Sequence, residues 1–284
     1  MVFTIFFSIF ASYFNIFTFL VVRKVYGILF CIMFFCVGCE WQLKPNTADV
    51  EDEIITIDRF DRIESQYLST GDFAALQQMN TTYPRQTRML IEDMLRVGKV
   101  DDPDINVKFL RFFQDSTLQT LLDDVQEKYA DMDDISEDLS DAFNRLKEEL
   151  PGIEIPYVYT QVGSFDQSVV VDNHSLGISL DKYLGADYPF YLRNYTEQQR
   201  SMMTRQMIVP DCLAFYVLSL YPIPRDLALT QEGRDLYMGK IQWVVNHVMK
   251  RKIFKGTHVD TVNHLMTEHK DMTIDQLLSS KNLK

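Results

Sequence analysis

The chain is short of the residue types that most often carry chemistry. Its 284 residues include only 4 cysteines, 5 histidines and 11 glycines. Three of the cysteines precede residue 40, so Cys212 is the one thiol in the rest of the sequence, and an internal disulfide is excluded there. Cys212 lies beside an apolar run with no histidine nearby in sequence, and we interpret it as a small core residue.

Neither the histidines nor the glycines follow a spacing typical of a catalytic or metal site. No histidine belongs to a His-Glu-x-x-His motif, and on a helix the spacing of His264 and His269 would point them in different directions. Gly177-Ile178-Ser179 lacks the second glycine of a nucleophile elbow, and the scattered glycines form no phosphate-binding loop. Asp131, Asp133 and Asp134 lack the glycine and the final acid of a calcium loop. We predict no catalytic residue, no metal and no cofactor.

Positive charge is also scarce. The 40 acidic residues outnumber the 28 basic ones, which gives a formal net charge of −12. Such a surface repels phosphate backbones and anionic headgroups, which argues against nucleic acid as a partner and against peripheral binding to anionic lipid. The composition, 46% hydrophobic and 24% charged, is that of a globular protein with enough apolar material for a core.

The first 38 residues have the composition of a targeting segment. Residues 1–22 are almost wholly apolar, Arg23-Lys24 interrupts them, and a second apolar run covers residues 25–37. A basic pair, a short apolar run and a small residue before a cysteine is the layout of a secretory signal. The end of this run, Cys36-Val37-Gly38-Cys39, resembles a bacterial lipobox with Cys39 as the lipidated residue. We expect residues 1–38 to be a signal peptide, with a true start near Val22 and an over-read upstream.

This interpretation predicts a protein tethered outside the cytoplasm. Loss of residues 1–38 removes Arg23 and Lys24 and no acid, so the formal net charge changes from −12 to −14. Residues 39–52 would be a polar tether and residues 53–284 a single globular domain. We expect a lipid anchor in a bacterial membrane, namely the outer membrane facing the periplasm. The alternative is a single uncleaved anchor, since residues 1–22 are long enough to span a bilayer and residues 25–37 are not.

Helical periodicity flanks a short β-rich stretch. Residues 129–150 carry an apolar stripe at helical spacing, with acids in the first turns, where the helix dipole favours them. Residues 155–162 and 168–180 are β-rich, with a turn at Asp172-Asn173. Further helices are predicted over residues 60–68, 73–79, 86–95, 107–113, 118–129, 197–208, 210–220, 230–248 and 259–266, and a capping box at Thr273 and Gln276 starts another. The predicted class is α+β, a mostly helical single domain with a small antiparallel sheet in the middle.

The stretch 178–191 has the clearest local signals. Ile178 and Leu180 alternate with Ser179, as in a half-buried strand. Asp181 stands where a short helix needs an N-cap, and Gly185 where it needs a left-handed stop. A strand, a one-turn helix and an aromatic corner would hold side chains in fixed directions, which suits recognition. The candidate binding residues are Asp181, Tyr183, Asp187, Tyr188 and Tyr191.

Other interpretations of these residues stay open. Asp181, Asp187 and Asp211 could pair as acid and base, although capping and turn roles explain each of them at least as well. The tyrosines and Phe190 could be core residues, as aromatics at this spacing usually are. They could also anchor an interface, because tyrosine joins a large apolar ring to a polar tip.

Several motifs along the chain form a set. The most specific is Leu180-Asp181-Lys182-Tyr183-Leu184-Gly185-Ala186-Asp187. It is accompanied by the signal with Cys39 and by Ile57-Asp58-Arg59-Phe60-Asp61, Tyr157-Val158-Tyr159-Thr160, Ile208-Val209-Pro210-Asp211 and Gly239-Lys240. Together they resemble the GldB family of gliding-motility lipoproteins from Bacteroidetes, over most of residues 54–249.

The resemblance implies a fold and a function. The family is similar in arrangement to zinc metallopeptidases, in which a small sheet precedes the ligand-bearing helix; here that helix would be residues 210–220, which contain no histidine. It implies a zincin-like frame without its metal and a non-catalytic binding or assembly role in gliding or secretion machinery. The expected partner is an envelope protein or an extended peptide, bound along the sheet edge and the corner. An envelope hydrolase using Asp carboxylates or an unrecognised metal is the alternative, and a purely structural component is a third hypothesis.

Overall fold

The structure is a computed structural model that describes residues 52–172 and 174–280. The described residues belong to the second of the two units into which the chain divides, Asp52–Lys284. The predictions for the signal peptide over residues 1–38, the lipidated Cys39 and nearly all of the tether lie outside the described residues. The second unit holds every helix and strand that the structure describes.

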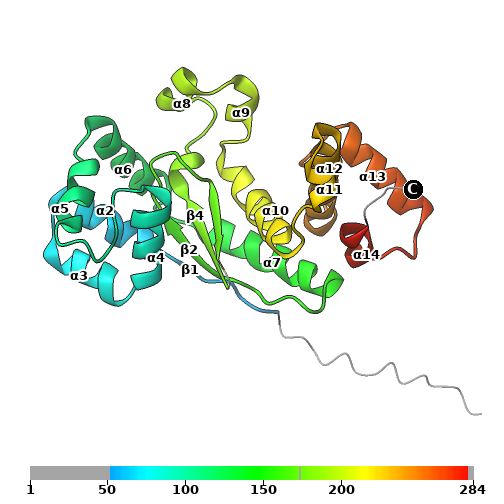
Figure 1. Cartoon of the computed structure of the whole chain (residues 1–284), viewed down its shortest axis with the longest axis horizontal. Helices are drawn as coiled ribbons and strands as arrows, with labels where there is room; N and C mark the ends of the chain where they lie inside the picture. The colour runs from blue at the N-terminus through cyan, green and yellow to red at the C-terminus, as the bar shows by residue number, and fades with distance from the viewer. Residues whose placement is uncertain (1–51, 173, 281–284) are drawn as a thin grey trace, which may run out of the picture. The chain divides into compact units, whose positions relative to one another are not determined.

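The first half of this unit is helical, as its periodicity predicts (Figure 1). It contains α2 (Phe60–Thr70), α3 (Phe73–Thr81), α4 (Pro84–Arg88), the π-helix η1 (Met89–Met94), α5 (Ile105–Phe112), α6 (Ser116–Lys128) and α7 (Asp133–Glu149). In α7 the predicted apolar stripe is buried, from Ile135 to Leu146. Asp133 and Asp134 lie in its first turn, where their charges complement the helix dipole. The acidic segment thus starts a helix.

The sheet is mixed rather than antiparallel. Its strands β1 (Ile57–Asp58), β2 (Tyr157–Gln161), β3 (Val169–Asp172) and β4 (Ser175–Ser179) lie in the order β1-β2-β4-β3. β3 and β4 form the predicted antiparallel hairpin, whereas β2 pairs in parallel with both β1 and β4. The prediction of an antiparallel sheet is wrong for these two pairings. β2 and β4 are buried at successive residues, which is typical of central strands that are covered on both faces and can pair in parallel.

Short helices and then longer ones follow the sheet. They are η2 (Leu180–Lys182), α8 (Pro189–Asn194), α9 (Glu197–Ser201), η3 (Arg205–Met207), α10 (Ile208–Leu220), α11 (Arg225–Ala228), α12 (Gln231–Met249), α13 (Thr257–Glu268) and α14 (Ile274–Ser279). The helix predicted over residues 197–208 is broken into α9 and η3. α10 begins at Ile208, so Pro210 lies within its first turn, where a missing N–H costs no helical hydrogen bond. The capping box at Thr273 and Gln276 is confirmed.

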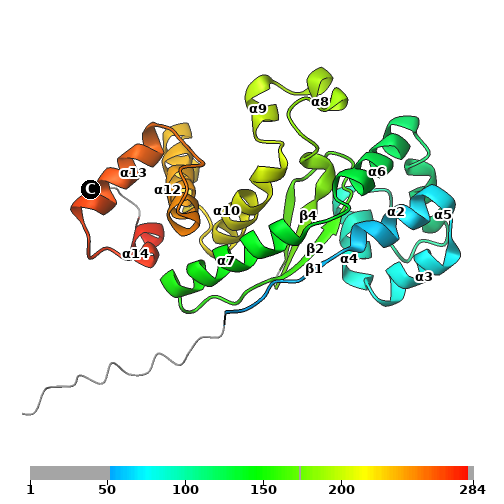
Figure 2. The same cartoon turned by 180° about the vertical axis from the view of Figure 1, so that it is seen from behind.

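One continuous hydrophobic core unites these elements. It runs from Ile55 to Leu278 and includes Cys212, which is fully buried as predicted. Figures 1 and 2 show α2 to α6 on one side of the sheet, α10 on the other, and α12 to α14 beyond α10. In both views α8 and α9 project from the end of the sheet opposite to the one where the described chain begins. Within the described part, no helix combines the length and the apolar character needed to cross a bilayer.

Candidate functional site

Asp181 is a buried anchor rather than a helix cap. It lies inside η2, whose N-cap is Ser179, and it is fully buried. Its Oδ1 accepts a hydrogen bond from the N–H of Gly163 at 2.7 Å, and its Oδ2 accepts one from the N–H of Phe165 at 2.5 Å. The prediction of an N-cap is therefore wrong. The carboxylate instead fastens the loop between β2 and β3 to the corner, and local sequence signals could not place that loop beside it.

Gly185 adopts the positive φ that the sequence predicts. Its φ is +112°, a conformation that glycine tolerates because it has no β-carbon. It lies two residues after Tyr183, the C-cap of η2, and its N–H donates to the carbonyl of Met203 at 2.9 Å. The chain therefore turns away from the sheet at the predicted residue.

Tyr183 and Tyr191 are interior supports of the corner. Both are buried, with 1% and 0% exposure. The Tyr191 hydroxyl donates to the carbonyl of Asp181 and accepts from the N–H of Leu184 at 3.2 Å. The Tyr183 hydroxyl donates to Oδ2 of Asp211 at 2.8 Å. Burial raises the pKa of both phenols, so they remain neutral donors.

Asp187 and Tyr188 are the two candidate residues that reach the surface. Asp187 is exposed, and Tyr188 is half-buried. The Tyr188 hydroxyl donates to Oδ2 of Asp124 at 2.8 Å, and its ring packs edge-on against Tyr191 with centroids 5.0 Å apart. The structure thus divides the five candidates: Asp181, Tyr183 and Tyr191 hold the corner from inside, and a contact with a partner stays a prediction for Asp187 and Tyr188.

Other side chains around the corner extend this surface, among them Phe190, which the sequence offered as a core or an interface aromatic. The ring of Phe165 stacks on Phe190 at 4.0 Å with an interplanar angle of 5°. Lys182 donates to the carbonyl of Phe165 at 3.1 Å, which ties the same loop down again. Leu192 on α8 and Met202 beside α9 are 52% and 38% exposed. Both lie on or beside helices of only five or six residues, which are too short for a helical repeat, so the sequence carried no signal for them.

The buried carboxylates near the corner have raised pKa values, and each accepts a hydrogen bond from within the fold. Burial raises the pKa of Asp181 to about 6 and, against the hydrogen bond from Tyr183, raises that of Asp211 to about 6 as well. Burial also raises the pKa of Glu64, whose Oε2 accepts from the N–H of Val162 at 2.9 Å. Each of these carboxylates has its own internal donor. Among the described residues, no three His, Cys, Asp or Glu side chains come together in a way that could hold a metal ion.

Two other motifs of the predicted family set form contacts of the fold. Asp61 is fully buried and binds the Arg59 guanidinium through two hydrogen bonds of 2.8 and 2.9 Å. It also accepts from the hydroxyl of Thr160, which joins α2 to β2. Lys240 is fully buried, and its ammonium donates to the carbonyl of Ser280 at 2.6 Å, which fastens the end of α14 to α12. These motifs maintain the scaffold on which the corner is built.

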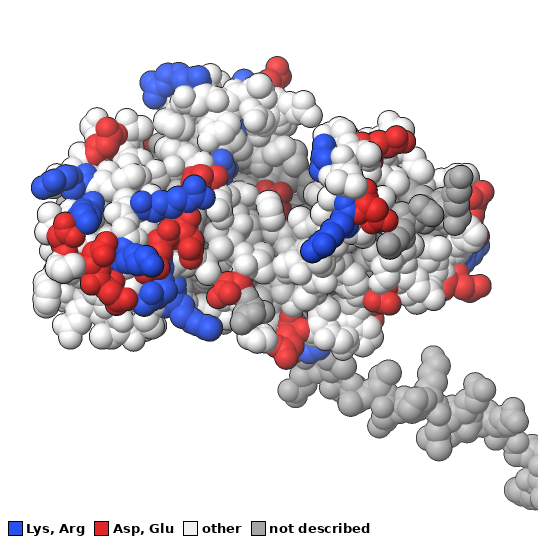
Figure 3. Space-filling model, viewed as in Figure 1, with Lys and Arg blue, Asp and Glu red and all other residues white. Residues whose placement is uncertain are grey.

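Charge is distributed unevenly over the face in Figure 3. Lysines, arginines, aspartates and glutamates gather over the end formed by α2 to α6. Over the middle of the face, where Figure 1 shows the strands and α10, charged side chains are sparse. An interface that excludes water is easier to form where few charges have to be desolvated.

A family model described as gliding motility protein GldB matches residues 40–253. The match covers well over half of the chain and includes the corner and all four strands. No curated protein and no solved structure was found to match. The zincin-like arrangement therefore stays a prediction.

Proposed function

This chain belongs to the family of gliding motility protein GldB, and on that premise we propose that it is a lipid-anchored, non-catalytic component of the cell envelope. It would serve the gliding or secretion machinery by binding a protein partner or an extended peptide at the corner. The family match over residues 40–253 carries this proposal. The matched range begins next to Cys39, the residue that the sequence predicts to be lipidated.

The arrangement of the corner supports binding. Asp187 and Tyr188 lie on a backbone that Asp181 and Tyr191 hold by buried hydrogen bonds. Such a surface loses little conformational entropy when a partner docks. The sheet edge is the other predicted place of contact, and of its two edge strands β3 packs against α10. The corner lies at the end of the sheet away from the start of the described chain.

Two observations support a non-catalytic role. The α10 helix, which takes the place of the ligand-bearing helix in the predicted frame, contains no histidine. Asp181 is fully buried and its two oxygens accept the N–H groups of Gly163 and Phe165, so this carboxylate supports the loop and does not face solvent. The hydrolase alternative is left with Asp187 and Asp211, and metal analysis of the purified protein tests it: stoichiometric zinc would favour that alternative.

The lipid anchor is tested by the Cys39→Ala substitution. Acyl chains contribute about 0.8 kcal/mol per buried methylene, so a protein with several chains stays on the membrane. A protein without any acyl chain is released. Cys39→Ala should move the protein from the carbonate-washed membrane fraction to the soluble fraction. Cys31→Ala, which changes a cysteine within the predicted signal peptide, should leave the protein on the membrane. Retention of the Cys39→Ala protein would rule out anchoring through this residue.

The binding surface is tested by site-specific photo-cross-linking in cells. A photoreactive residue at Leu192, beside the corner, should give a discrete adduct that the Asp187→Lys substitution abolishes. The matched control is Leu229, which is 82% exposed and equally apolar but lies on the segment after α11. Equal adducts from both positions, or none from Leu192, would contradict a partner at the corner.

A further inference from the structure

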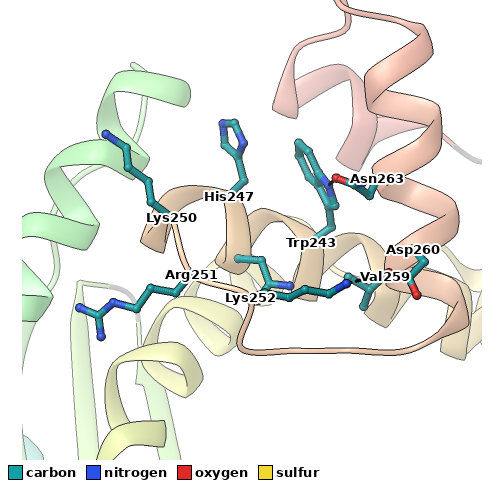
Figure 4. Close-up of a pocket in the computed structure, with 9 residues that line it drawn as sticks. Trp243, His247, Lys250, Arg251, Lys252, Val259, Asp260 and Asn263 are labelled. Carbon is teal, nitrogen blue, oxygen red and sulfur yellow. Dashed lines mark hydrogen bonds and ion pairs between the residues drawn. The ribbon is translucent and has the colours of Figure 1, made fainter.

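Two buried oxygens between α2 and the sheet have no hydrogen-bond partner within the described part of the chain. They are Oε1 of Glu64 and Oε1 of Gln161, and both side chains are fully buried. Polar side chains elsewhere bind one another: in the pocket between α12 and α13, Trp243 donates to Asn263 and Lys252 pairs with Asp260 (Figure 4). A buried oxygen without a donor is costly, so the pair between α2 and the sheet needs a physical explanation.

Glu64 lies beside the residue that carries the second oxygen. Its Oε2 accepts from the N–H of Val162 at 2.9 Å, and that N–H belongs to the peptide bond with Gln161. One turn earlier on α2, the Phe60 ring packs edge-on against Tyr159, with centroids 6.3 Å apart. Phe60 and Glu64 share a face of α2. Tyr159 and Gln161 share a face of β2, so the same two elements place Glu64 next to Gln161.

The charges around Glu64 balance only when it carries a proton. Asp61 and Asp181 are also fully buried. The Arg59 guanidinium binds Asp61 at 2.8 and 2.9 Å, and the Lys182 ammonium acts on Asp181 by its charge. Three carboxyl groups thus share two cations, and an ionised Glu64 would leave one negative charge in the interior. Burial, and then the charges of the other two carboxylates, raise the pKa of Glu64 well above its ordinary value of 4.5.

The described elements that pack against α2 bring no cation to Glu64. β2 contributes the phenol of Tyr159, which stays neutral because burial raises its pKa. α6 contributes the uncharged amide of Gln126, and α3 carries no charged residue. Lys108 and Arg111 of α5 are exposed. An ionised Glu64 would therefore have only the dipole of the Val162 N–H to stabilise it.

The loop after β2, residues 162–165, is strained. Ser164 and Phe165 have φ values of +55° and +64°, in the left-handed region that favours glycine. Two successive residues with side chains keep this conformation only where the surrounding structure holds them. The Phe165 ring stacks on Phe190 at 4.0 Å, so the shape of the loop also sets one side of the corner.

Two buried carboxyl groups hold this loop. Glu64 binds the N–H of Val162, and Asp181 binds the N–H groups of Gly163 and Phe165 at 2.7 and 2.5 Å. The charge of Asp181 also acts on Glu64, so the two groups repel each other when both are ionised. The proton on Glu64 therefore bears directly on how firmly the loop is held.

We propose that Glu64 is neutral in the folded protein and that loss of its proton releases the loop 162–165, so that this residue is a pH-sensitive latch on the corner. The O–H of Glu64 would donate to the unpartnered oxygen of Gln161, which satisfies both atoms at once. An ionised Glu64 is driven toward water by its own desolvation and by the charge of Asp181, and it withdraws from Val162. The protonation of Glu64 does not depend on what binds at the corner.

The direction of the pH effect follows from proton binding. The folded state holds the Glu64 proton more tightly than the unfolded state, because its pKa is raised. The contribution to stability is fully present below the ordinary value of 4.5 and is lost as the pH rises through the pKa of the folded state.

The protonation state is tested by carbon-13 NMR of the glutamate side-chain carboxyl groups in the full chain, with Glu64→Gln used to assign the Glu64 signal. At about pH 6, more than one unit above the ordinary value of 4.5, this signal should still be that of a neutral carboxyl group. Titration of Glu64 near 4.5 would overturn the proposal. The two unpartnered oxygens would then belong to a bridging water or to a turned Gln161 amide.

The release of the loop is tested by amide hydrogen exchange in the parent and in Glu64→Gln. This variant keeps an oxygen for Val162 and offers an NH₂ group to Gln161, but it cannot ionise. Above the pKa of Glu64, opening of the loop no longer needs to release a bound proton in the variant or the parent, but only the parent carries the buried charge. Exchange at Gly163 and Phe165 in the parent should therefore rise about tenfold over one pH unit around that pKa, relative to Glu64→Gln at the same pH.

The matched control is Glu92→Gln. Glu92 also accepts a backbone N–H, that of Val100 at 2.9 Å, but it pairs with Arg88 and keeps contact with solvent. Glu92→Gln should show the same pH dependence of exchange in the loop as the parent. Equal pH dependence in the parent and Glu64→Gln, or its loss in Glu92→Gln, would overturn the proposal.

Discussion

Asp181 and Asp187 lie in the same corner, and their environments are opposite. Asp181 is fully buried with two backbone donors, and Asp187 is exposed. In Asp181→Asn one N–H would face an amide NH₂ instead of an oxygen. A buried donor left without an acceptor costs roughly 1–3 kcal/mol. We therefore expect Asp181→Asn to lower the free energy of unfolding by about 2 kcal/mol, as measured by urea denaturation.

The matched control is Asp187→Asn, which changes the same groups at the surface. Exposed substitutions usually stay within about 0.5 kcal/mol of the parent. Equal losses in the two variants would contradict the division of the corner into buried supports and surface residues. This division could not be predicted from the sequence, because the donors to Asp181 come from the loop at Gly163 and Phe165.

Asp211 should make stability depend on pH. Its pKa of about 6 in the folded state lies above its ordinary value of 3.8, chiefly because of burial. The folded state therefore holds the proton more tightly than the unfolded state. This contribution to stability is fully present below about pH 4 and is lost as the pH rises through 6. Asp211→Asn keeps an oxygen for Tyr183 but cannot ionise, so unfolding measurements between pH 4 and pH 7 should show a smaller slope.

The expected difference in stability is smaller than for a fully buried group, because Asp211 keeps some solvent exposure. We expect Asp211→Asn to be more stable than the parent at pH 7 by about 1–2 kcal/mol and to differ little at pH 4. Tyr183→Phe serves as the opposing variant. The hydrogen bond from Tyr183 lowers the pKa of Asp211, so its loss should move the midpoint of the pH dependence upward. Identical pH profiles for Asp211→Asn and the parent would contradict this assignment.

At the scale of elements, α7 holds the first described segment by its polar side chains. Asn144 accepts from the N–H of Glu53 at 3.0 Å and donates to the carbonyl of the same residue at 2.9 Å. Ser140 accepts from the N–H of Ile55 at 2.9 Å, and Ser136 donates to the carbonyl of Ile55. Since these three residues are spaced four apart, they lie on one face of the helix. Their side chains satisfy backbone N–H and carbonyl groups that a neighbouring strand would otherwise bind.

Ser140→Ala tests this contact. It removes the acceptor of a buried backbone N–H, so the free energy of unfolding should fall by about 1–2 kcal/mol. Amide hydrogen exchange at Ile55 and Ile57 should accelerate more than exchange in β4, because the lost hydrogen bond affects only the segment before β1. Asp141→Ala, the adjacent exposed position of α7, should change neither measurement beyond about 0.5 kcal/mol. Faster exchange throughout the sheet would show that the contact is not local.

Helical periodicity predicted α7 because this helix buries one face, and a repeat of 3.6 residues records that directly. The predicted stripe of α12 is buried too, together with residues between its members, because several helices pack around α12. Periodicity could not predict the break between α9 and η3, since that segment is short and contributes few core residues. Parallel pairing of β2 with β4 was also beyond it, because the pairing joins strands that are separated by the whole of β3.

At the scale of the molecule, one core joins the sheet to the last helix. α10 packs against both β3 and α12, and α7 also contacts α12. We therefore predict one cooperative unfolding transition for the second unit. In a Trp41→Phe variant, which leaves Trp243 as the one indole, fluorescence and far-UV circular dichroism should give the same denaturation midpoint. An earlier midpoint for Trp243 would show that α12 to α14 unfold separately.

The sequence by itself determined the α+β class, most helix positions, the burial of Cys212 and the turn at Gly185, because periodicity, caps and positive φ are encoded within a few neighbouring residues. Its family motifs also indicated the family that the match over residues 40–253 shows. Tertiary structure alone decided which candidates at the corner are buried and how the strands pair. These depend on contacts between segments far apart in the chain, where no local pattern records the partner.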